Sequence, residues 1–134
     1  MAIYGYQHAY RSYCMDVAQP GSVVKHAPFD AVLADVPCSG SGNWNRSPEQ
    51  FYFFTKQKST HYSSLQQQVG QNAIRNCKPG GREYYITCSL FHNENVQVVK
   101  SLIENESISL HEQHLVDASM YGGDYMFIAI LEKH

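Results

Sequence analysis

A short apolar run that stops at a proline sets the fold of this chain. Residues 29–36 (FDAVLADV) have the composition of a strand buried in a parallel sheet. Pro37 ends the run, and a cysteine with a serine- and glycine-rich turn follows in residues 38–42. In open sheets flanked by helices, ligands bind just beyond the carboxyl ends of such strands. The run therefore predicts an α/β fold with a candidate site directly after residue 36.

Three further stretches have the pattern of helices. The longest has one apolar stripe at spacings of three and four residues, formed by Tyr62, Leu65, Val69, Ala73 and Cys77. Residues 78–81 (KPGG) should end it, because proline cannot continue a helix and glycine adopts the left-handed cap. A shorter helix is predicted where Ser47 can cap, Pro48 fits the first position and Gln50 can complete a capping box. Asn93 can cap a third helix, whose inner face is Val96, Val99, Leu102 and Ile103.

Three more stretches have the composition of strands, namely residues 84–87, 108–115 and 125–131. Residues 116–124 separate the last two and are too few for a helical crossover, so these strands should be antiparallel neighbours. The alternation of strands and helices from residue 29 onward predicts a sheet flanked by helices and parallel in its first part. Residues 29–134 are therefore expected to form the main domain. Residues 1–28 form a separate segment with a possible edge strand at residues 10–15.

Composition excludes several classes of protein. The chain has 134 residues, 43% of them apolar and 16% charged, which is typical of one globular domain. Its formal charge of −2 provides no strong basic field. No apolar run reaches the length of about 18 residues that spans a bilayer, and the opening residues lack the pattern of a signal peptide. These observations favour a cytoplasmic chain with free thiols and no membrane partner.

Two of the four cysteines stand where chemistry is expected. Cys38 follows the first predicted strand and Cys88 directly follows residues 84–87. Because the carboxyl ends of parallel strands meet at one edge of a sheet, both thiols can face a single cleft. A small buried cysteine in an ordinary turn also fits each position taken alone. The coincidence favours a site, whereas Cys14 and Cys77 lack this setting and are predicted to be packing residues.

Other common sites are not indicated. No Cys-x-x-Cys pair occurs, and His111 and His114 lie on a presumed strand, so no metal site is expected. Asn45 stands where a dinucleotide fingerprint needs its third glycine. No glycine lies two residues before Ser41, which excludes a nucleophile elbow.

Several motifs in order resemble one enzyme family. They are residues 35–42 (DVPCSGSG), 46–49 (RSPE), 78–81 (KPGG), 85–90 (YITCSL) and the pair Glu94-Asn95. Together they resemble the Sun/RsmB family of RNA cytosine-5 methyltransferases, which use S-adenosylmethionine and act on ribosomal or transfer RNA. The resemblance runs from about Asp16 to the carboxyl terminus. It implies a partial Rossmann-like class I methyltransferase sheet with flanking helices, S-adenosylmethionine as cofactor and RNA as partner.

The resemblance also implies roles for individual residues. Cys88 would be the nucleophile that adds to carbon 6 of cytosine, which makes carbon 5 able to accept a methyl group. Cys38 would assist release of the product. Asp35 would lie between cofactor and base and hydrogen-bond the cytosine edge, and Pro37 would border the cofactor beside it. Asp16 matches the position of a family aspartate that contacts the adenosine of the cofactor.

The chain also departs from the family pattern. The family's Pro-Gly-Gly-Lys cofactor loop is expected before Asp16, and residues 1–15 do not contain it. Residues 29–134 are therefore expected to be the carboxyl-terminal half of a catalytic domain, with a non-catalytic remnant or association domain as the alternative. Its first strand would have an open apolar edge, which predicts either a homodimer or pairing of residues 1–28 along that edge. Arg82 and Glu83 place charges where the family strand is apolar, which fits either an edge exposed to water or drift.

Overall fold

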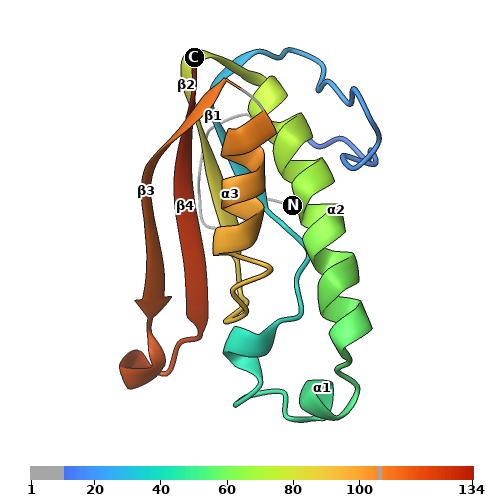
Figure 1. The fold of residues 1–134 in the computed structure, drawn as a ribbon, viewed down its shortest axis with the longest axis vertical. Coiled ribbons are helices and arrows are strands. Elements are labelled where there is room, and N and C mark those ends of the chain that lie inside the picture. The colour runs from blue at the N-terminus through green and yellow to red at the C-terminus, as the bar shows by residue number, and fades with distance from the viewer. Residues whose placement is uncertain (1–10, 106) are drawn as a thin grey trace.

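The structure is a computed structural model that describes residues 11–105 and 107–134. Figure 1 shows a single sheet with two long helices, α2 and α3, lying against it. In chain order the elements are β1 (Phe29–Asp35), η1 (Ser41–Asn43), α1 (Glu49–Tyr52), α2 (Lys56–Arg75), β2 (Cys77–Thr87), α3 (Val96–Asn105), β3 (Ile108–Asp117), η2 (Ser119–Tyr121) and β4 (Tyr125–Lys133).

The sheet has the order β1-β2-β4-β3. β1 and β2 are parallel, because α2 carries the chain back to the starting edge between them. β3 and β4 pair antiparallel along nearly their whole length, and β4 also pairs antiparallel with β2. The predicted α/β class, the parallel first pair and the antiparallel last pair are confirmed.

The boundaries of α2 differ from the prediction at both ends. The helix begins at Lys56, where the Thr55 hydroxyl accepts a hydrogen bond from the Lys58 amide at 3.3 Å. It ends at Arg75, so Cys77 lies on β2 instead of on the helix stripe, although it is buried as predicted. Residues 78–81 do not end the helix. They form an irregularity within β2: Cys77 pairs with Phe29 of β1, the next paired residue of β2 is Arg82, and residues 78–81 have no partner in this register.

Two predicted helix caps are wrong. α1 begins at Glu49 with Pro48 before it and no side-chain cap hydrogen bond, so Ser47 does not form the expected capping box. Asn93 is not the N-cap of α3, because the helix begins only at Val96; the Asn93 side-chain nitrogen donates instead to the Ser59 hydroxyl at 2.8 Å. Rules for helix caps consider only neighbouring residues. They do not include the long-range contacts of the loops in which these two residues lie.

The amino-terminal segment also differs from expectation. Residue 10 lies outside the described residues, and residues 11–15 form no strand, so the possible edge strand is not found in the described part. Cys14 is exposed and is therefore not a packing residue. Side chains at the carboxyl end of α2 hold the segment: Asn72 donates to the Val17 carbonyl at 2.7 Å, and Asn76, the C-cap residue, accepts from the Val24 backbone amide at 2.8 Å.

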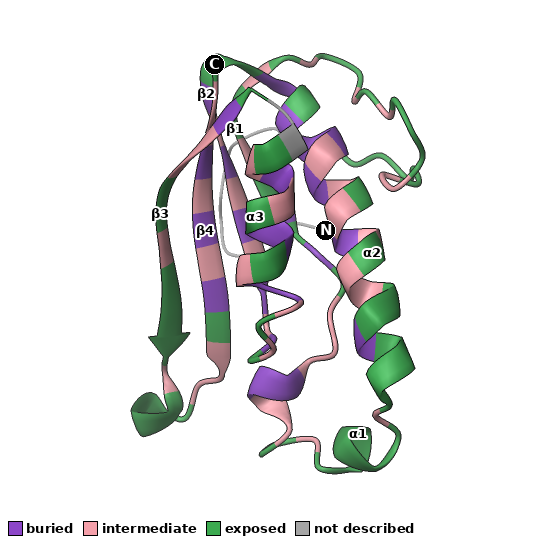
Figure 2. Cartoon of the chain, viewed as in Figure 1, coloured by how far each residue is buried: buried purple, intermediate pink, exposed green. Residues whose placement is uncertain are grey.

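The core lies between the sheet and the two long helices. Figure 2 shows buried residues alternating with partly exposed ones along β2 and β4, as expected for a sheet with one covered face. The buried apolar side chains that meet there include Ala73, Ile74, Tyr85, Val98, Val99, Leu102, Phe127, Ala129 and Leu131. Val96 and Ile103 pack against this cluster, which confirms the predicted inner face of α3.

Glu83 lies inside this core and not at an edge exposed to water. Its side chain is fully buried on the face of β2 that also carries Tyr85 and Thr87. The neighbouring Arg82 points to the other face, where its guanidinium pairs with Glu132 at 3.2 Å. The charge at position 82 is therefore accommodated at the surface, and the carboxyl at position 83 is enclosed by apolar groups.

The outer edge of β1 is open in the described part of the chain. The sheet order places β1 at one end, so it has a strand neighbour on one side only. Leu33, in the middle of this strand, is 69% exposed. The open apolar edge expected from the sequence is thus present.

Candidate active site

The two candidate cysteines come together at the carboxyl edge of the parallel pair. Cys38 follows β1 in a short loop, and Cys88 directly follows β2. The loops touch, since the Gly42 amide donates to the Cys88 carbonyl at 2.8 Å. A Cβ atom on Gly42 would lie 2.4 Å from the Tyr125 carbonyl oxygen and 2.9 Å from that of Cys88. Only glycine therefore lets the loop approach β2 and β4 this closely.

The Cys38 thiol is largely buried and lies next to Cys88. Burial raises the pKa of the Cys38 thiol to about 11, and the charges of Cys88 and Glu94 act in the same direction. The backbone amides of Gly40 and Cys88 oppose this shift. Cys38 is consequently protonated at neutral pH, in a position next to a second, half-buried thiol.

Three serine hydroxyls lock the two loops to each other. Ser39, Ser41 and Ser89 form a triangle with oxygen separations of 3.2 to 3.4 Å. Ser41 Oγ also accepts from the Leu90 amide at 2.8 Å, and Ser89 Oγ from the Phe91 amide at 3.1 Å. Each hydroxyl thus joins a chain of hydrogen bonds between the segments that carry Cys38 and Cys88.

The buried carboxylate of Glu94 fixes the Cys38 loop by hydrogen bonds. It is fully buried, and its two oxygens accept from the Ser39 amide at 2.8 Å and from the Ser59 hydroxyl at 2.7 Å. Tyr85 donates its hydroxyl proton to the Glu94 carbonyl at 2.7 Å. Glu94 therefore connects β2, α2 and the Cys38 loop in one network.

Asn95 holds the second loop in the same way. Its side-chain oxygen accepts from the Thr87 hydroxyl at 2.6 Å, and its amide donates to the Ser89 carbonyl at 2.7 Å. The sequence reasoning recognised Glu94 and Asn95 only as part of a motif and missed their structural role. The available signal was two polar residues directly before an apolar helix, next to a loop rich in hydroxyl groups.

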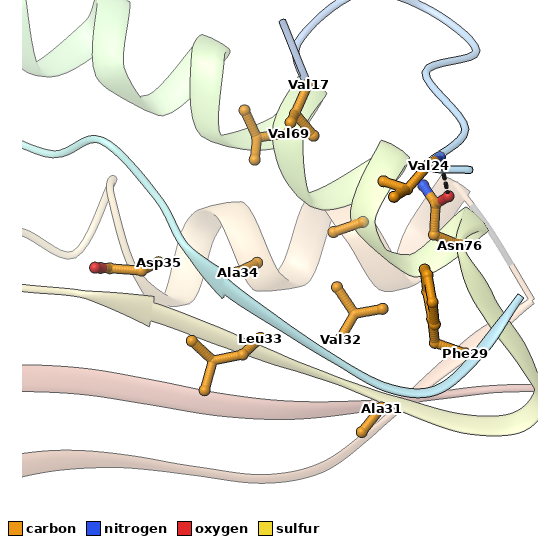
Figure 3. A pocket seen from close by; sticks show the side chains of 11 residues that line it. Val17, Val24, Phe29, Ala31, Val32, Leu33, Ala34, Asp35, Val69 and Asn76 are labelled. Carbon is orange, nitrogen blue, oxygen red and sulfur yellow. Dashed lines mark hydrogen bonds between the residues drawn. The ribbon is translucent and has the colours of Figure 1, made fainter. Parts of the chain in front are cut away.

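Asp35 and Pro37 directly precede Cys38, with Asp35 at the end of β1. Asp35 lines a cavity of about 460 Å³ that follows the open edge of β1. Figure 3 shows this cavity between β1 and α2, with Asp35 at one end and Val24 and Asn76 toward the other. The Pro37 carbonyl accepts a hydrogen bond from the side-chain amide of Gln66 at 2.9 Å, which fixes the turn between this cavity and Cys38.

Asp16 is not brought to this site. Its carboxylate accepts from the Ala18 amide at 3.0 Å and from the Gln19 side chain at 3.3 Å, within a local turn. The neighbouring Val17 lines the cavity along β1, whereas Asp16 does not. The arrangement therefore brings Cys38 and Cys88 together, with Asp35 three residues before Cys38 in the chain, and leaves Asp16 exposed.

The cavity along β1 fits only part of S-adenosylmethionine. Its lining is mostly apolar, which suits an adenine ring. Its polar side chains are Asp35 and Asn76, and Asn76 already bonds to the amide of Val24 and the carbonyl of Ser22. One carboxylate cannot satisfy both the ribose hydroxyls and the amino-acid end of the cofactor. The described residues thus form one wall of such a site.

The described residues show neither a membrane helix nor a metal centre. None of the helices in residues 11–105 and 107–134 is long and apolar enough to cross a bilayer. Within the same residues, no group of three histidine, cysteine or carboxylate side chains is placed to hold a metal ion.

The chain is similar to known ribosomal RNA methyltransferases. It is 34% identical over 89 residues to the ribosomal RNA small subunit methyltransferase F of Aeromonas salmonicida, covering 66% of this chain and 19% of that protein. It is 30% identical over 90 residues to the probable ribosomal RNA small subunit methyltransferase B of Bacillus subtilis, covering 67% of this chain and 20% of that protein. The chain thus spans about a fifth of the length of these two relatives.

Solved structures show the same arrangement. The crystal structure of PH0851 superposes with a TM-score of 0.72 at 29% identity, over 78% of this chain and 26% of that one. The structure of NSun6 from Pyrococcus horikoshii with SFG has a TM-score of 0.65 at 24% identity, over 75% of this chain and 29% of that one, and supports the fold alone. The family model described as 16S rRNA methyltransferase RsmB/F matches residues 5–129. Since this match covers most of the sequence, the chain belongs to the RsmB/F family of 16S rRNA methyltransferases.

Proposed function

We propose that this chain carries the two thiols of an RNA cytosine-5 methyltransferase that acts on ribosomal RNA with S-adenosylmethionine as cofactor. One observation carries the proposal: Cys38 and Cys88 lie side by side after two adjacent parallel strands, in loops that share one hydrogen-bond network. The ribosomal RNA methyltransferases among its relatives support the class of substrate.

The proposed chemistry divides the work between the two cysteines. The Cys88 thiolate adds to carbon 6 of cytosine, and the electron pair of the 5,6 double bond moves toward carbon 5, which becomes nucleophilic. S-adenosylmethionine, when bound, supplies the methyl group. The carbon 5 proton is then lost to solvent, and its electron pair restores the double bond and expels the Cys88 thiolate. Cys38 assists this release, and Asp35 at the end of β1 accepts a hydrogen bond from the amino group of cytosine.

The raised pKa of Cys38 supports this division. A thiol that burial keeps protonated at neutral pH is a poor nucleophile, because the thiolate is the reactive form. The same thiol can donate its proton to the Cys88 sulfur as that sulfur leaves carbon 6, which assists release. Cys88 is thus the better candidate for attack.

The proposal is tested by hydrogen exchange at carbon 5. Reversible addition of a thiolate to carbon 6 lets carbon 5 take a deuteron from heavy water and lose its original proton, without any methyl donor. The protein containing this segment should therefore introduce deuterium at carbon 5 of cytosine in substrate RNA. Cys14→Ala should exchange like the wild type, and Cys88→Ala should not exchange. Absence of exchange with the wild type would instead favour a non-catalytic association domain.

Binding of the cofactor to residues 1–134 alone should be weak. The cavity beside β1 offers an apolar wall and one available carboxylate, so it can hold only part of S-adenosylmethionine. We expect isothermal titration calorimetry to detect no binding with a dissociation constant in the low-micromolar range. A dissociation constant of a few micromolar for this chain would show that the described residues already form a complete site.

The open edge of β1 should lead to self-association. A strand with unpaired backbone groups and an exposed Leu33 is a template for pairing with a second chain. We propose that two copies pair through β1, and light scattering of residues 1–134 should report at least a dimer. Leu33→Lys should shift the population toward monomer. A monomer at high concentration in the wild type would contradict association through this edge.

A further inference from the structure

A cluster of aromatic rings lies beside the Cys38 loop. The Trp44 ring is 5.3 Å from Phe51, 5.2 Å from Phe54 and 5.7 Å from Phe91, and Phe54 stacks on Phe91 at 4.9 Å. The Trp44 indole also donates to the Ser39 carbonyl at 3.3 Å. The cluster thus connects α1 and the start of α2 to the backbone next to Cys38.

Three consecutive aromatic side chains, one of them a member of this cluster, are largely exposed. Phe51 is 66% exposed, Tyr52 84% and Phe53 62%, and we call these three residues the aromatic ridge. The Tyr52 and Phe53 rings meet edge to face at 5.3 Å. Exposing three large rings in a row is costly in water, and none of the three belongs to the core. The ridge therefore indicates a binding surface.

A cavity connects the ridge to the Cys38 thiol. It has a volume of about 320 Å³, and its lining consists of Cys38, Ser39, Gln50, Phe53, Phe54, Lys58 and Tyr62. This volume is at the lower end of the usual range for small-molecule sites and suits a nucleotide. Phe53 belongs to both the ridge and the cavity, so a chain of nucleotides can pass from one to the other.

Positive charge accompanies the ridge. Residues 50–82 contain no aspartate or glutamate, and Lys56 and Lys58 lie in the first turn of α2. Cations at this end of a helix are disfavoured by the helix dipole, so helix stability does not explain the two lysines. Lys58 Nζ donates to the Phe53 carbonyl at 2.8 Å, which holds the ammonium group at the rim of the cavity. In a chain of net charge −2, this positive region faces the same cavity as the thiol.

We propose that the aromatic ridge and Lys58 bind single-stranded RNA on one side of the reacting cytosine. Bases adjacent to the target stack on Phe53 and Tyr52, and Lys58 binds a backbone phosphate. Aromatic rings with interspersed cations suit unpaired bases, since every base has a flat face to stack. The ridge therefore holds the strand without reading its sequence. This inference rests on the proposed function, because it takes Cys38 as a part of the reaction site.

The test measures RNA affinity and places it on the surface. A labelled single-stranded RNA of 12 nucleotides is titrated with residues 1–134 by fluorescence anisotropy, and Trp44, the only tryptophan, reports binding through its own emission. Phe53→Ala should weaken binding about tenfold, because stacking on one ring is lost. Lys58→Gln should weaken it less and lower the salt dependence by about one phosphate contact. Duplex RNA of the same length should bind more weakly and leave Trp44 emission unchanged.

Matched controls separate the possible outcomes. Tyr121→Ala removes a 92% exposed ring on η2, and Lys100→Gln removes an exposed cation on α3, so both should bind like the wild type. Equal affinity of Phe53→Ala and the wild type would overturn the inference, as would an equal loss in Tyr121→Ala. If the wild type exchanges at carbon 5 and Phe53→Ala binds RNA as tightly as the wild type, the role of the ridge is refuted and the proposed chemistry stands. Loss of RNA binding in Phe53→Ala, with no exchange in the wild type, would refute the proposed chemistry and leave the ridge as an RNA site.

Discussion

Cys88→Ala should abolish both methyl transfer and any covalent RNA adduct, whereas Cys38→Ala should let the adduct form and accumulate. The difference follows from the proposed order of events, in which Cys88 makes the bond to carbon 6 and Cys38 acts only when that bond breaks. The protein containing this segment is incubated with substrate RNA and cofactor and analysed on a denaturing gel. The adduct appears there as a slowly migrating band.

The gel also decides the assignment of the two thiols. Cysteine after proline is the nucleophile in the analogous DNA cytosine-5 methyltransferases, and Cys38 occupies that position here. A retained complex for Cys88→Ala, with none for Cys38→Ala, would exchange the two roles and keep the two-thiol mechanism. Cys14→Ala, which changes an exposed thiol outside the site, should turn over without accumulating an adduct.

Glu83→Leu should stabilise the folded chain, and the gain should grow with pH. Burial raises the pKa of the Glu83 carboxyl well above its usual range, and neither carboxyl oxygen has a hydrogen-bond partner among the described residues. The folded state therefore holds this proton more tightly than the unfolded state does. The contribution of Glu83 to the free energy of unfolding is therefore most favourable below the pKa of the unfolded carboxyl, near pH 4. It falls as the pH rises toward the pKa of this carboxyl in the folded state.

Chemical denaturation between pH 5 and pH 9 measures this effect. The free energy of unfolding of Glu83→Leu should exceed that of the wild type by about 2 kcal/mol at pH 8, the order of cost for a buried unpaired polar group. Glu83→Gln should remove the pH dependence with a smaller gain, because a buried polar amide remains. Glu104→Gln, an exposed change on α3, is the control and should follow the wild type. An unchanged pH slope in Glu83→Leu would show that another group dominates.

Much of the fold could be predicted because its signals are local. The apolar run of β1 ends at a proline, and the short link before β4 excludes a crossover, so strand directions followed directly. The start of α2 was missed because Lys56, Gln57 and Lys58 are polar and carry no apolar stripe. Cys77 was placed on the helix because it continues the spacing of four residues, although the helix ends at Arg75.

The proximity of the two cysteines was predicted, and the hydrogen-bond network that supports their loops was not. Cys38 and Cys88 could be paired in advance because both follow strands whose ends meet at one edge. The triangle of Ser39, Ser41 and Ser89 depends on how closely two loops approach each other, which the sequence does not specify. The burial of Glu83 could have been predicted from the alternation of side chains along a strand, because residues 83 and 85 lie on the same face of β2.

The serine triangle and the buried Glu94 have a consequence for how a substrate must approach. Because shared hydrogen bonds tie together the loops that carry the thiols, neither cysteine can move outward without breaking several bonds at once. Both thiols are also only partly accessible. In the proposed reaction the nucleotide must therefore move: its base rotates out of the stack and enters the site edge first. A cytosine that is already unpaired would avoid the unstacking cost of a few kcal/mol, so the proposal makes RNA secondary structure around the target a determinant of which cytosine reacts.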